Sequence, residues 1–167
     1  MTNVATRFQP DISGSAVPSG FVGQVISSVT ANANIPAGSA LFGDVTSILL
    51  TAGLWQINGY YSLARNSATF TSTDIALGIT NGATSGTNFV AGVNYQNPGA
   101  VIPTSFSRAE LFVSPFVVRC DGSTITRVED NIAFTNSGLT LYLKLYVAVF
   151  TAGTPQGQGK LTAIRLA

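Results

Sequence analysis

The chain has no histidine, one cysteine and one tryptophan, and charged residues make up only 9% of its 167 residues. Histidine is the commonest general base and a frequent metal ligand, so its absence removes most of the side-chain sets used in catalysis and in zinc binding. The abundant serines also lack the Gly-x-Ser-x-Gly sequence that activates a nucleophilic hydroxyl. We therefore expect a protein that is not an enzyme and that holds no cofactor and no metal ion.

The few charges are not gathered into clusters. Eight basic and seven acidic residues give a net charge of +1, whereas a nucleic-acid binder groups Lys and Arg to neutralise phosphates. The most apolar stretch, residues 139–152, is interrupted by Lys144 and is shorter than the roughly 20 residues that span a bilayer. We expect no nucleic-acid partner and no membrane insertion. Low charge on a chain that is 46% hydrophobic instead suggests oligomerisation or assembly.

Two local groups of titratable residues could carry chemistry. Cys120 follows Arg119, which could lower a thiol pKa, but catalytic cysteines commonly use a histidine base. We interpret Cys120 as a free structural thiol. The adjacent carboxylates of Glu129 and Asp130, with Asp121 nearby in the sequence, could bind Ca²⁺. Neighbours in a strand point to opposite faces, however, so we favour two surface carboxylates.

A glycine-rich segment near the C-terminus has some likeness to a phosphate-binding loop. Residues 153–162 read GTPQGQGKLT. The phosphate-loop pattern needs a glycine where this chain has Thr154, and a serine or threonine where it has Leu161. The segment also lies between two predicted strands rather than between a strand and a helix. We expect no nucleotide binding.

The clearest local pattern covers residues 48–64, which predict a strand, a tight turn at Gly53 and a second strand. Alternate residues after the turn are apolar and polar, the pattern of a half-buried strand. Trp55 enters the apolar side of this strand just after the turn. We predict that Trp55 anchors the core of a hairpin.

The remaining sequence predicts an all-β fold: a single-domain jelly-roll sandwich of about eight antiparallel strands. Turn signals separate the other predicted strands, which cover residues 21–29, 69–80, 106–119, 124–134, 139–150 and 160–167. Pro115 predicts that the strand 106–119 is an edge strand or is divided into two short pieces. Residues 121–122 and 136–138 are predicted turns, and residues 32–38 and 151–159 are predicted loops.

The strand at residues 139–150 has two different faces. One face is aliphatic and is predicted to join the core; its members are Leu141, Leu143, Leu145, Val147 and Val149. The other face contains Tyr142, Lys144, Tyr146, Ala148 and Phe150. Aromatic side chains are enriched at protein interfaces, so Tyr142, Tyr146 and Phe150 form a candidate subunit interface. The alternative is that another part of the same chain covers this face.

Two segments without clear periodicity are candidates for contacts with partners. Residues 1–17 form a predicted extended arm, followed by a knob domain at 18–167. The arm could be a flexible terminus, but its low charge favours docking on a neighbouring subunit or a larger particle through Arg7, Phe8, Asp11 and Ile12. Residues 81–103 form a long loop of the kind that contacts partners. Its candidate partner or receptor residues are Phe89, Asn94, Tyr95 and Gln96.

Three parts of the sequence resemble the small knob domains of tailed-bacteriophage virion proteins. These are residues 18–26 (PSGFVGQVI), the LTAGLW core of residues 48–64, and residues 140–166, with a Tyr- and Leu-rich strand, a glycine-rich loop and a short strand ending in AIRL. The resemblance implies a jelly roll like that of tumour-necrosis-factor-type proteins, assembled as a homotrimer. It also implies a place on a virus particle.

The leading hypothesis is therefore a non-enzymatic bacteriophage structural protein: a homotrimeric knob of the capsid-decoration or head-fibre type. Its partners would be itself and other virion proteins. The start of the chain shows no basic segment followed by an apolar run, so we expect synthesis in the host cytoplasm without a signal peptide, and location in the virion. The alternative is a receptor-binding tail-fibre or tail-tip adhesin whose 81–103 loop contacts a host surface glycan or protein.

Overall fold

The computed structural model describes residues 19–34, 43–64, 75–82, 108–131, 133–134, 138–147 and 156–167. These residues form nine β-strands and no helix. The strands are β1 (Val25–Asn34), β2 (Gly43–Leu49), β3 (Gly53–Ala64), β4 (Ile75–Thr80), β5 (Arg108–Asp121), β6 (Thr124–Arg127), β7 (Ala133–Phe134), β8 (Thr140–Val147) and β9 (Gln156–Arg165).

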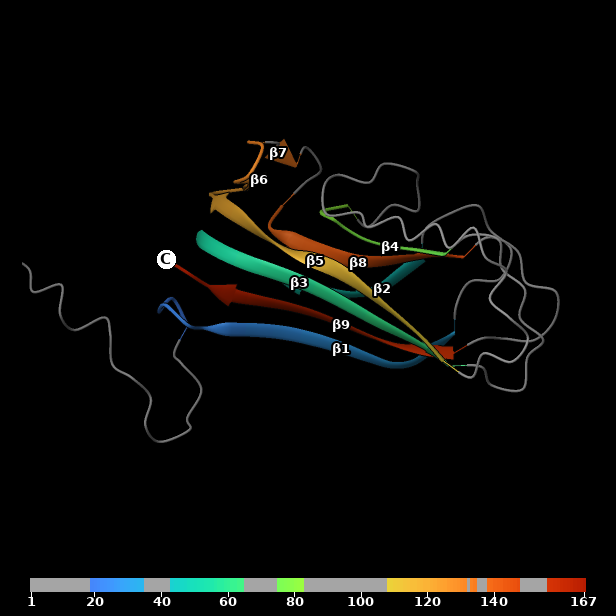
Figure 1. Cartoon of the computed structure of the whole chain (residues 1–167). Coiled ribbons are helices and arrows are strands. Elements are labelled where there is room, and N and C mark those ends of the chain that lie inside the picture. The colour runs from blue at the N-terminus through green and yellow to red at the C-terminus, as the bar shows by residue number, and fades with distance from the viewer. Residues whose placement is uncertain are drawn as a thin grey trace, which may run out of the picture.

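All strand pairs are antiparallel and belong to two sheets. The larger sheet has the order β1-β9-β3-β5-β6-β7, and the smaller sheet has the order β2-β8-β4. From β1 to β5 the chain changes sheet at every step, and it does so again from β8 to β9. In Figure 1 the larger sheet lies in front of the smaller one. The predicted all-β architecture in two antiparallel sheets is therefore confirmed.

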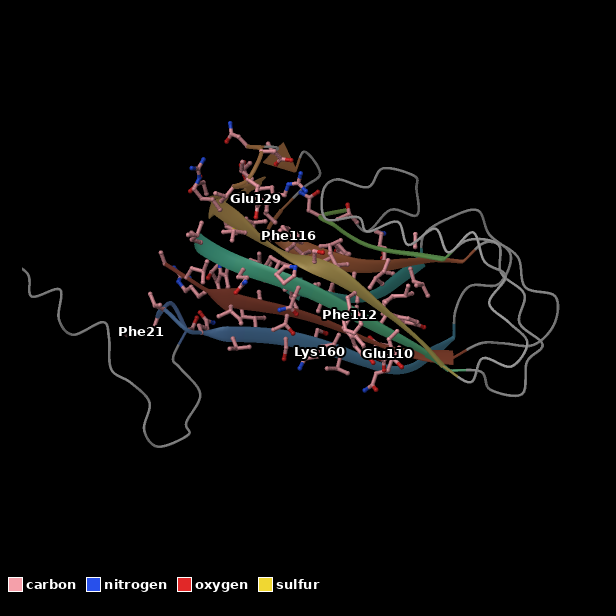
Figure 2. All side chains as sticks on the ribbon, in the orientation of Figure 1. Phe21, Glu110, Phe112, Phe116, Glu129 and Lys160 are labelled. Carbon is pink, nitrogen blue, oxygen red and sulfur yellow. The ribbon has the colours of Figure 1, made fainter. Side chains whose placement is uncertain are left out.

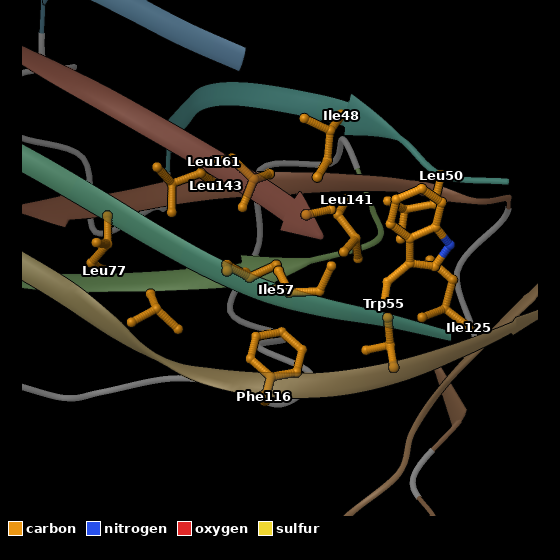
Figure 3. Packing of buried hydrophobic residues seen from close by; sticks show 14 of the residues in the cluster. Ile48, Leu50, Trp55, Ile57, Leu77, Phe116, Ile125, Leu141, Leu143 and Leu161 are labelled. Carbon is orange, nitrogen blue, oxygen red and sulfur yellow. The ribbon is translucent and has the colours of Figure 1, made fainter. Parts of the chain in front are cut away.

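The core lies between the two sheets, where alternate side chains of both meet (Figure 3). The larger sheet contributes Trp55, Ile57, Phe116 and Leu161, and the smaller sheet contributes aliphatic residues such as Leu143. The Trp55 side chain is fully buried. Its indole Nε1 donates a hydrogen bond to the backbone oxygen of Thr51 at 2.9 Å, so the one polar atom of the ring is satisfied.

Residues 48–64 do not form the predicted hairpin. β2 pairs with β8 in the smaller sheet, whereas β3 pairs with β5 and β9 in the larger sheet. The connection after β2 is therefore a corner between the two layers. Gly53 at this corner has a φ of +143°, and a Cβ there would lie 2.6 Å from the backbone oxygen of Ala167. A glycine is needed both for the backbone angle and for this close approach.

The chain termini of the described domain meet at this corner. The backbone nitrogen of Leu54 donates to the oxygen of Ala167 at 2.9 Å, and the nitrogen of Gly23 donates to the oxygen of Arg165 at 2.8 Å. The Arg165 guanidinium lies 5.3 Å from the centre of the Trp55 ring. The start of β1, the end of β9 and the corner are thus held together at one end of the sandwich (Figure 1).

Pro115 does not divide its strand as predicted, but beside it β5 has a described partner, β3, on one side only, because the pairing of β5 with β6 begins at Val118. β5 is one strand of 14 residues between β3 and β6. Pro115 is accommodated by a bulge, because Ile57 pairs with Phe116 and Gly59 pairs with Val113. Two residues of β5, Ser114 and Pro115, therefore stand opposite one residue of β3, a position that tolerates proline.

Three other predicted boundaries also differ. Residues 19–23 form turns, so β1 begins at Val25 and continues to Asn34 through part of the predicted 32–38 loop. The predicted strand 124–134 is divided into β6 and the two-residue β7 by a turn at residues 128–130. β9 begins at Gln156, inside the predicted 151–159 loop. The turn at 121–122 is confirmed, because Gly122 has a φ of +62° between the paired residues Asp121 and Thr124.

Candidate interaction surface

The outer face of the larger sheet carries several exposed apolar side chains among the described residues. One side of each strand of this sheet faces the smaller sheet, and the other side faces away from it. On this outward side Val25 is 59% exposed, Val29 51% and Phe112 53%. Figure 2 shows Phe112 together with Lys160 and Glu110 on the larger sheet. These exposed apolar side chains make the face a candidate contact surface.

Strand register arranges the outer face in rows that cross the strands. The first row, here called the Phe112 row, contains Val29, Lys160, Tyr60 and Phe112, which are successive partners on β1, β9, β3 and β5. Side chains paired in this way point to the same side of a sheet. The rings of Tyr60 and Phe112 have centres 5.1 Å apart and are tilted by 45°, so they form one aromatic contact.

A second row, here called the Val117 row, runs parallel to the first and nearer to the corner. It contains Val25, Ile164, Gln56 and Val117 on the same four strands. The turn after β6 extends the row, because the Val128 nitrogen donates to the Val117 oxygen at 2.9 Å. The Val128 side chain is exposed. Between the two rows lie the polar side chains of Ser27, Thr162 and Asn58.

Two opposite charges lie on this face, on either side of β3. Lys160 belongs to β9 and Glu110 to β5, and both are exposed. The Tyr60 hydroxyl donates a hydrogen bond to Glu110 Oε1 at 3.2 Å. This contact directs the carboxylate toward the aromatic pair.

The candidate interface predicted on residues 139–150 lies on the outer face of the smaller sheet. Tyr142 is half-buried there, and the side chains of Tyr146 and Phe150 lie outside the described residues. Lys144, on the same face, is only 2% exposed within the single chain. Its Nζ forms an ion pair with Asp44 and lies 5.8 Å from the centre of the Tyr142 ring. At Lys144 the chain itself covers this face, as the alternative interpretation expects.

The other predicted partner residues cannot be placed on the fold. The arm residues Arg7, Phe8, Asp11 and Ile12 lie outside the described residues. So do the loop residues Phe89, Asn94, Tyr95 and Gln96. These two segments join the described domain at opposite ends of the sandwich. The arm joins at the corner end. The chain after the loop enters β5 at Arg108, which pairs with Ala64, the last residue of β3, at the other end.

The glycines of the segment that is similar to a phosphate loop have a packing role. Gly157 and Gly159 lie in β9 on the side facing the core. A Cβ on Gly157 would overlap the Tyr61 ring and hydroxyl, and one on Gly159 would overlap the Val45 side chain. These two glycines therefore make room for Tyr61 and Val45. The burial that results raises the pKa of Tyr61 above its ordinary value.

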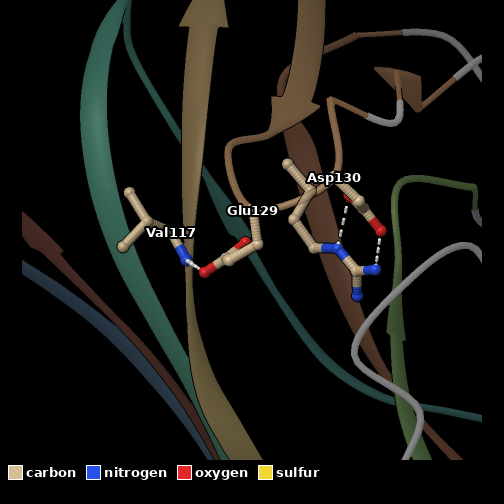
Figure 4. A network of polar contacts seen from close by, with 4 residues as sticks. Val117, Glu129 and Asp130 are labelled. Atoms are coloured by element: carbon tan, nitrogen blue, oxygen red, sulfur yellow. Dashed lines mark hydrogen bonds and ion pairs between the residues drawn. The ribbon is translucent and has the colours of Figure 1, made fainter.

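The carboxylates of Glu129 and Asp130 are engaged in contacts within the chain (Figure 4). Glu129 Oε1 accepts a hydrogen bond from the Val117 nitrogen at 2.9 Å. Asp130 Oδ1 accepts one from Arg127 Nε at 2.8 Å, and Arg127 Nη2 pairs with Oδ2. No group of three potential metal ligands occurs in the part of the chain that the structure describes. The pair acts as two structural carboxylates that fasten the turn after β6.

Cys120 lies near the end of β5 and is almost fully buried. Burial raises the pKa of its thiol from 9.0 to about 12, the Asp121 carboxylate adds to the increase, and the Arg165 guanidinium partly opposes it. Thiolates are the reactive form of cysteine. With so high a pKa and no access to solvent, this thiol is a poor nucleophile near neutral pH.

The raised pKa of Cys120 makes folding stability depend on alkaline pH. Above pH 9 the unfolded chain loses the thiol proton while the folded chain keeps it, so stability falls as pH rises toward 12. Between pH 8 and pH 10 we expect this group to remove about 1.4 kcal/mol from the free energy of unfolding. Denaturant titrations of the wild type and of Cys120→Ala at both pH values measure it. Equal pH dependence in the two proteins would contradict the assignment.

Comparisons with known protein families, with curated proteins and with solved structures found no match for this chain. Among the described residues, no helix is long and apolar enough to cross a membrane.

Sequence reasoning missed the outer face of the larger sheet as a site. Phe112 stands in the sequence AELFVSPF, where apolar residues occupy both faces of the strand. The sequence alone therefore does not show which of these residues is exposed. The rows become visible only when β1, β9, β3 and β5 are aligned, and that register is set by long-range pairing. A usable signal was the pair of outward valines, Val25 and Val29, in a strand without charge.

Proposed function

We propose that this chain is a non-enzymatic bacteriophage virion structural protein: a homotrimeric jelly-roll knob seated on the particle, of the capsid-decoration or head-fibre type. The observation that carries the proposal is the outer face of the larger sheet. Its two rows expose valines and Phe112 on a chain with 9% charged residues. A surface of this composition suits a protein that works in an assembly.

The strand order supports the jelly-roll part of the proposal. Four strands in the order β1-β9-β3-β5 face three strands in the order β2-β8-β4, and the chain alternates between them from β1 to β5. Double-sheet jelly rolls are a common fold of viral capsid proteins.

The available groups support a structural role over a catalytic one. The chain has no histidine, and the Cys120 thiol is buried with a raised pKa. The carboxylates of Glu129 and Asp130 fasten a turn. The described residues thus offer no set of groups that would combine a nucleophile with a base.

The copy number and position of the protein in intact particles test the proposal. Particles purified from infected cells would be quantified by mass spectrometry and labelled with antibody for electron microscopy. We expect many copies on the head. A few copies at the tail would favour the adhesin alternative, and absence from purified particles would contradict the virion role.

Deleting residues 1–17 is expected to abolish attachment to the particle and to leave the knob folded. The described domain begins at Ser19, and the start of β1 is held by bonds to β9 that do not involve the arm. Co-sedimentation of the truncated protein with particles lacking it measures attachment, and circular dichroism checks the fold. Unchanged attachment would refute the arm's role.

A further inference from the structure

We infer that an exposed apolar turn at the corner end of the sandwich seats the knob on the virion protein that carries it. The turn covers residues 19–23, is here called the base turn, and contains Phe21 and Val22. The inference rests on the virion role in the proposed function and adds a contact made by the folded domain to the one made by the arm. Its occupant is an apolar surface of that virion protein.

Hydrogen bonds and two glycines fix the backbone of the base turn. The Gly20 nitrogen donates to Gln24 Oε1 at 2.8 Å, and the Gln24 nitrogen donates to the Phe21 oxygen at 3.1 Å. The Gly23 nitrogen donates to the Arg165 oxygen at 2.8 Å and so fastens the turn to β9. Gly20 and Gly23 have φ of +88° and +87°, which residues with a side chain rarely adopt. The turn is therefore ordered before it meets a partner, which lowers the entropic cost of binding.

This fixed backbone exposes apolar side chains instead of burying them. Phe21 and Val22 are each 42% exposed, and Leu166, which follows the β9 residue bonded to the turn, is 39% exposed. Figure 2 places Phe21 at the end of the domain where β1 begins and β9 ends. The exposed part of these side chains adds nothing to the packing of the single chain. Its burial against a partner is favourable by about 25 cal/mol per Å² of apolar area.

The charge around the base turn indicates the chemistry of the partner. The sequence contains no charged residue from 12 to 43. The charged residue bonded to the turn, Arg165, has its guanidinium 5.3 Å from the centre of the Trp55 ring, and its Nη1 donates to the Thr51 hydroxyl at 3.1 Å. A patch of this kind favours an apolar protein surface over nucleic acid or anionic headgroups, which require clustered basic side chains.

The place where the arm joins the domain indicates which protein this partner is. The arm ends at residue 17, and the described domain begins at Ser19, next to Phe21 in the sequence. The proposed function attaches the arm to the particle, so the end of the domain that the arm enters is the end nearest to the particle. Binding of the arm holds the base turn at a high effective concentration beside the same surface. The arm then tethers the knob, and the base turn fixes its orientation.

A matched set of substitutions in the full chain tests this contact. Phe21→Asp places a charge in the patch, whereas Phe21→Leu keeps an apolar side chain there. Gln158→Asp adds the same charge at an exposed position of β9 near the other end of the sandwich. In titrations with particles that lack the protein, we expect Phe21→Asp to bind at least about tenfold more weakly than the wild type. The other two variants should bind within about twofold of the wild type.

Thiol labelling tests the same contact without relying on affinity. Val22→Cys places a thiol in the base turn, and the natural thiol of Cys120 is buried and does not compete for the label. A maleimide is expected to react with Val22→Cys at least about tenfold more slowly on the particle than in the free protein, because a covered thiol is not accessible. Gln158→Cys is the control and should react equally fast in both states.

The outcomes separate this inference from the proposed function. Weaker binding of Phe21→Asp together with protection of Val22→Cys supports both. If the wild type binds particles but Phe21→Asp binds equally well, or Val22→Cys stays reactive, the inference is overturned and the virion role stands. A lower mass of Phe21→Asp in light scattering would assign the turn to a contact between copies and would also overturn the inference. A wild-type protein that binds no particle overturns both.

Discussion

Replacing Trp55 by alanine is expected to lower the free energy of unfolding by about 3–5 kcal/mol. The side chain is fully buried between the sheets, so its removal leaves a cavity as well as a loss of apolar contact. The change also removes the indole hydrogen bond to Thr51 and the aromatic face beside the Arg165 guanidinium. Both contacts hold the corner where the start of β1 meets the end of β9, so the corner should loosen with the core.

Urea unfolding at one fixed protein concentration measures this effect, because association and folding are coupled in an oligomer. Trp55→Phe is the matched control: it keeps an aromatic ring in the core and should cost less than the alanine change. A loss below about 1 kcal/mol for Trp55→Ala would fall outside the range for a buried tryptophan. Such a result would show that the core is not built around this residue.

Replacing Gly159 by alanine is expected to cost about 1–3 kcal/mol, through overpacking rather than through backbone strain. The added Cβ would overlap Val45 Cγ1 and would lie 3.2 Å from Tyr61 Cδ2 and 3.4 Å from Leu143 Cδ2. Val45 approaches from the smaller sheet, so the two sheets would have to separate locally. Because interiors are closely packed, that movement disturbs neighbouring contacts.

A double-mutant cycle tests this explanation. Val45→Ala removes the atom that the new Cβ would meet, so Gly159→Ala should cost less in that background than in the wild type. Gln158→Ala serves as the control, because Gln158 directly precedes Gly159 in β9 and its side chain is exposed. It should change stability by no more than about 0.5 kcal/mol. Equal costs of Gly159→Ala in both backgrounds would exclude the contact with Val45 as the cause.

Local patterns in the sequence predicted where strands lie but not which sheet they join. Alternation of apolar and polar residues marks a strand and its buried side, as it did around Trp55. It carries no information on pairing partners, so β2 and β3 looked like a hairpin although they belong to different sheets. The prediction made from Pro115 also lacked this information on pairing partners. Its bulge depends on the register of β5 against β3, which is a tertiary property.

The candidate surface was less predictable than the fold. A strand such as β5 has apolar residues on both faces, and only its partners decide which face the smaller sheet covers. Lys144 is a second case: its face was a candidate subunit interface, with cover by the same chain as the alternative, and Lys144 is buried in an ion pair with Asp44. That contact joins residues 100 positions apart, beyond the reach of any local pattern.

The proposed virion role depends on self-association of this chain into a homotrimer. Multi-angle light scattering of the purified wild-type protein at micromolar concentration tests it most directly. The proposed homotrimer predicts a single species with three times the 17.3 kDa mass of the chain. A single species with the mass of one chain would contradict it.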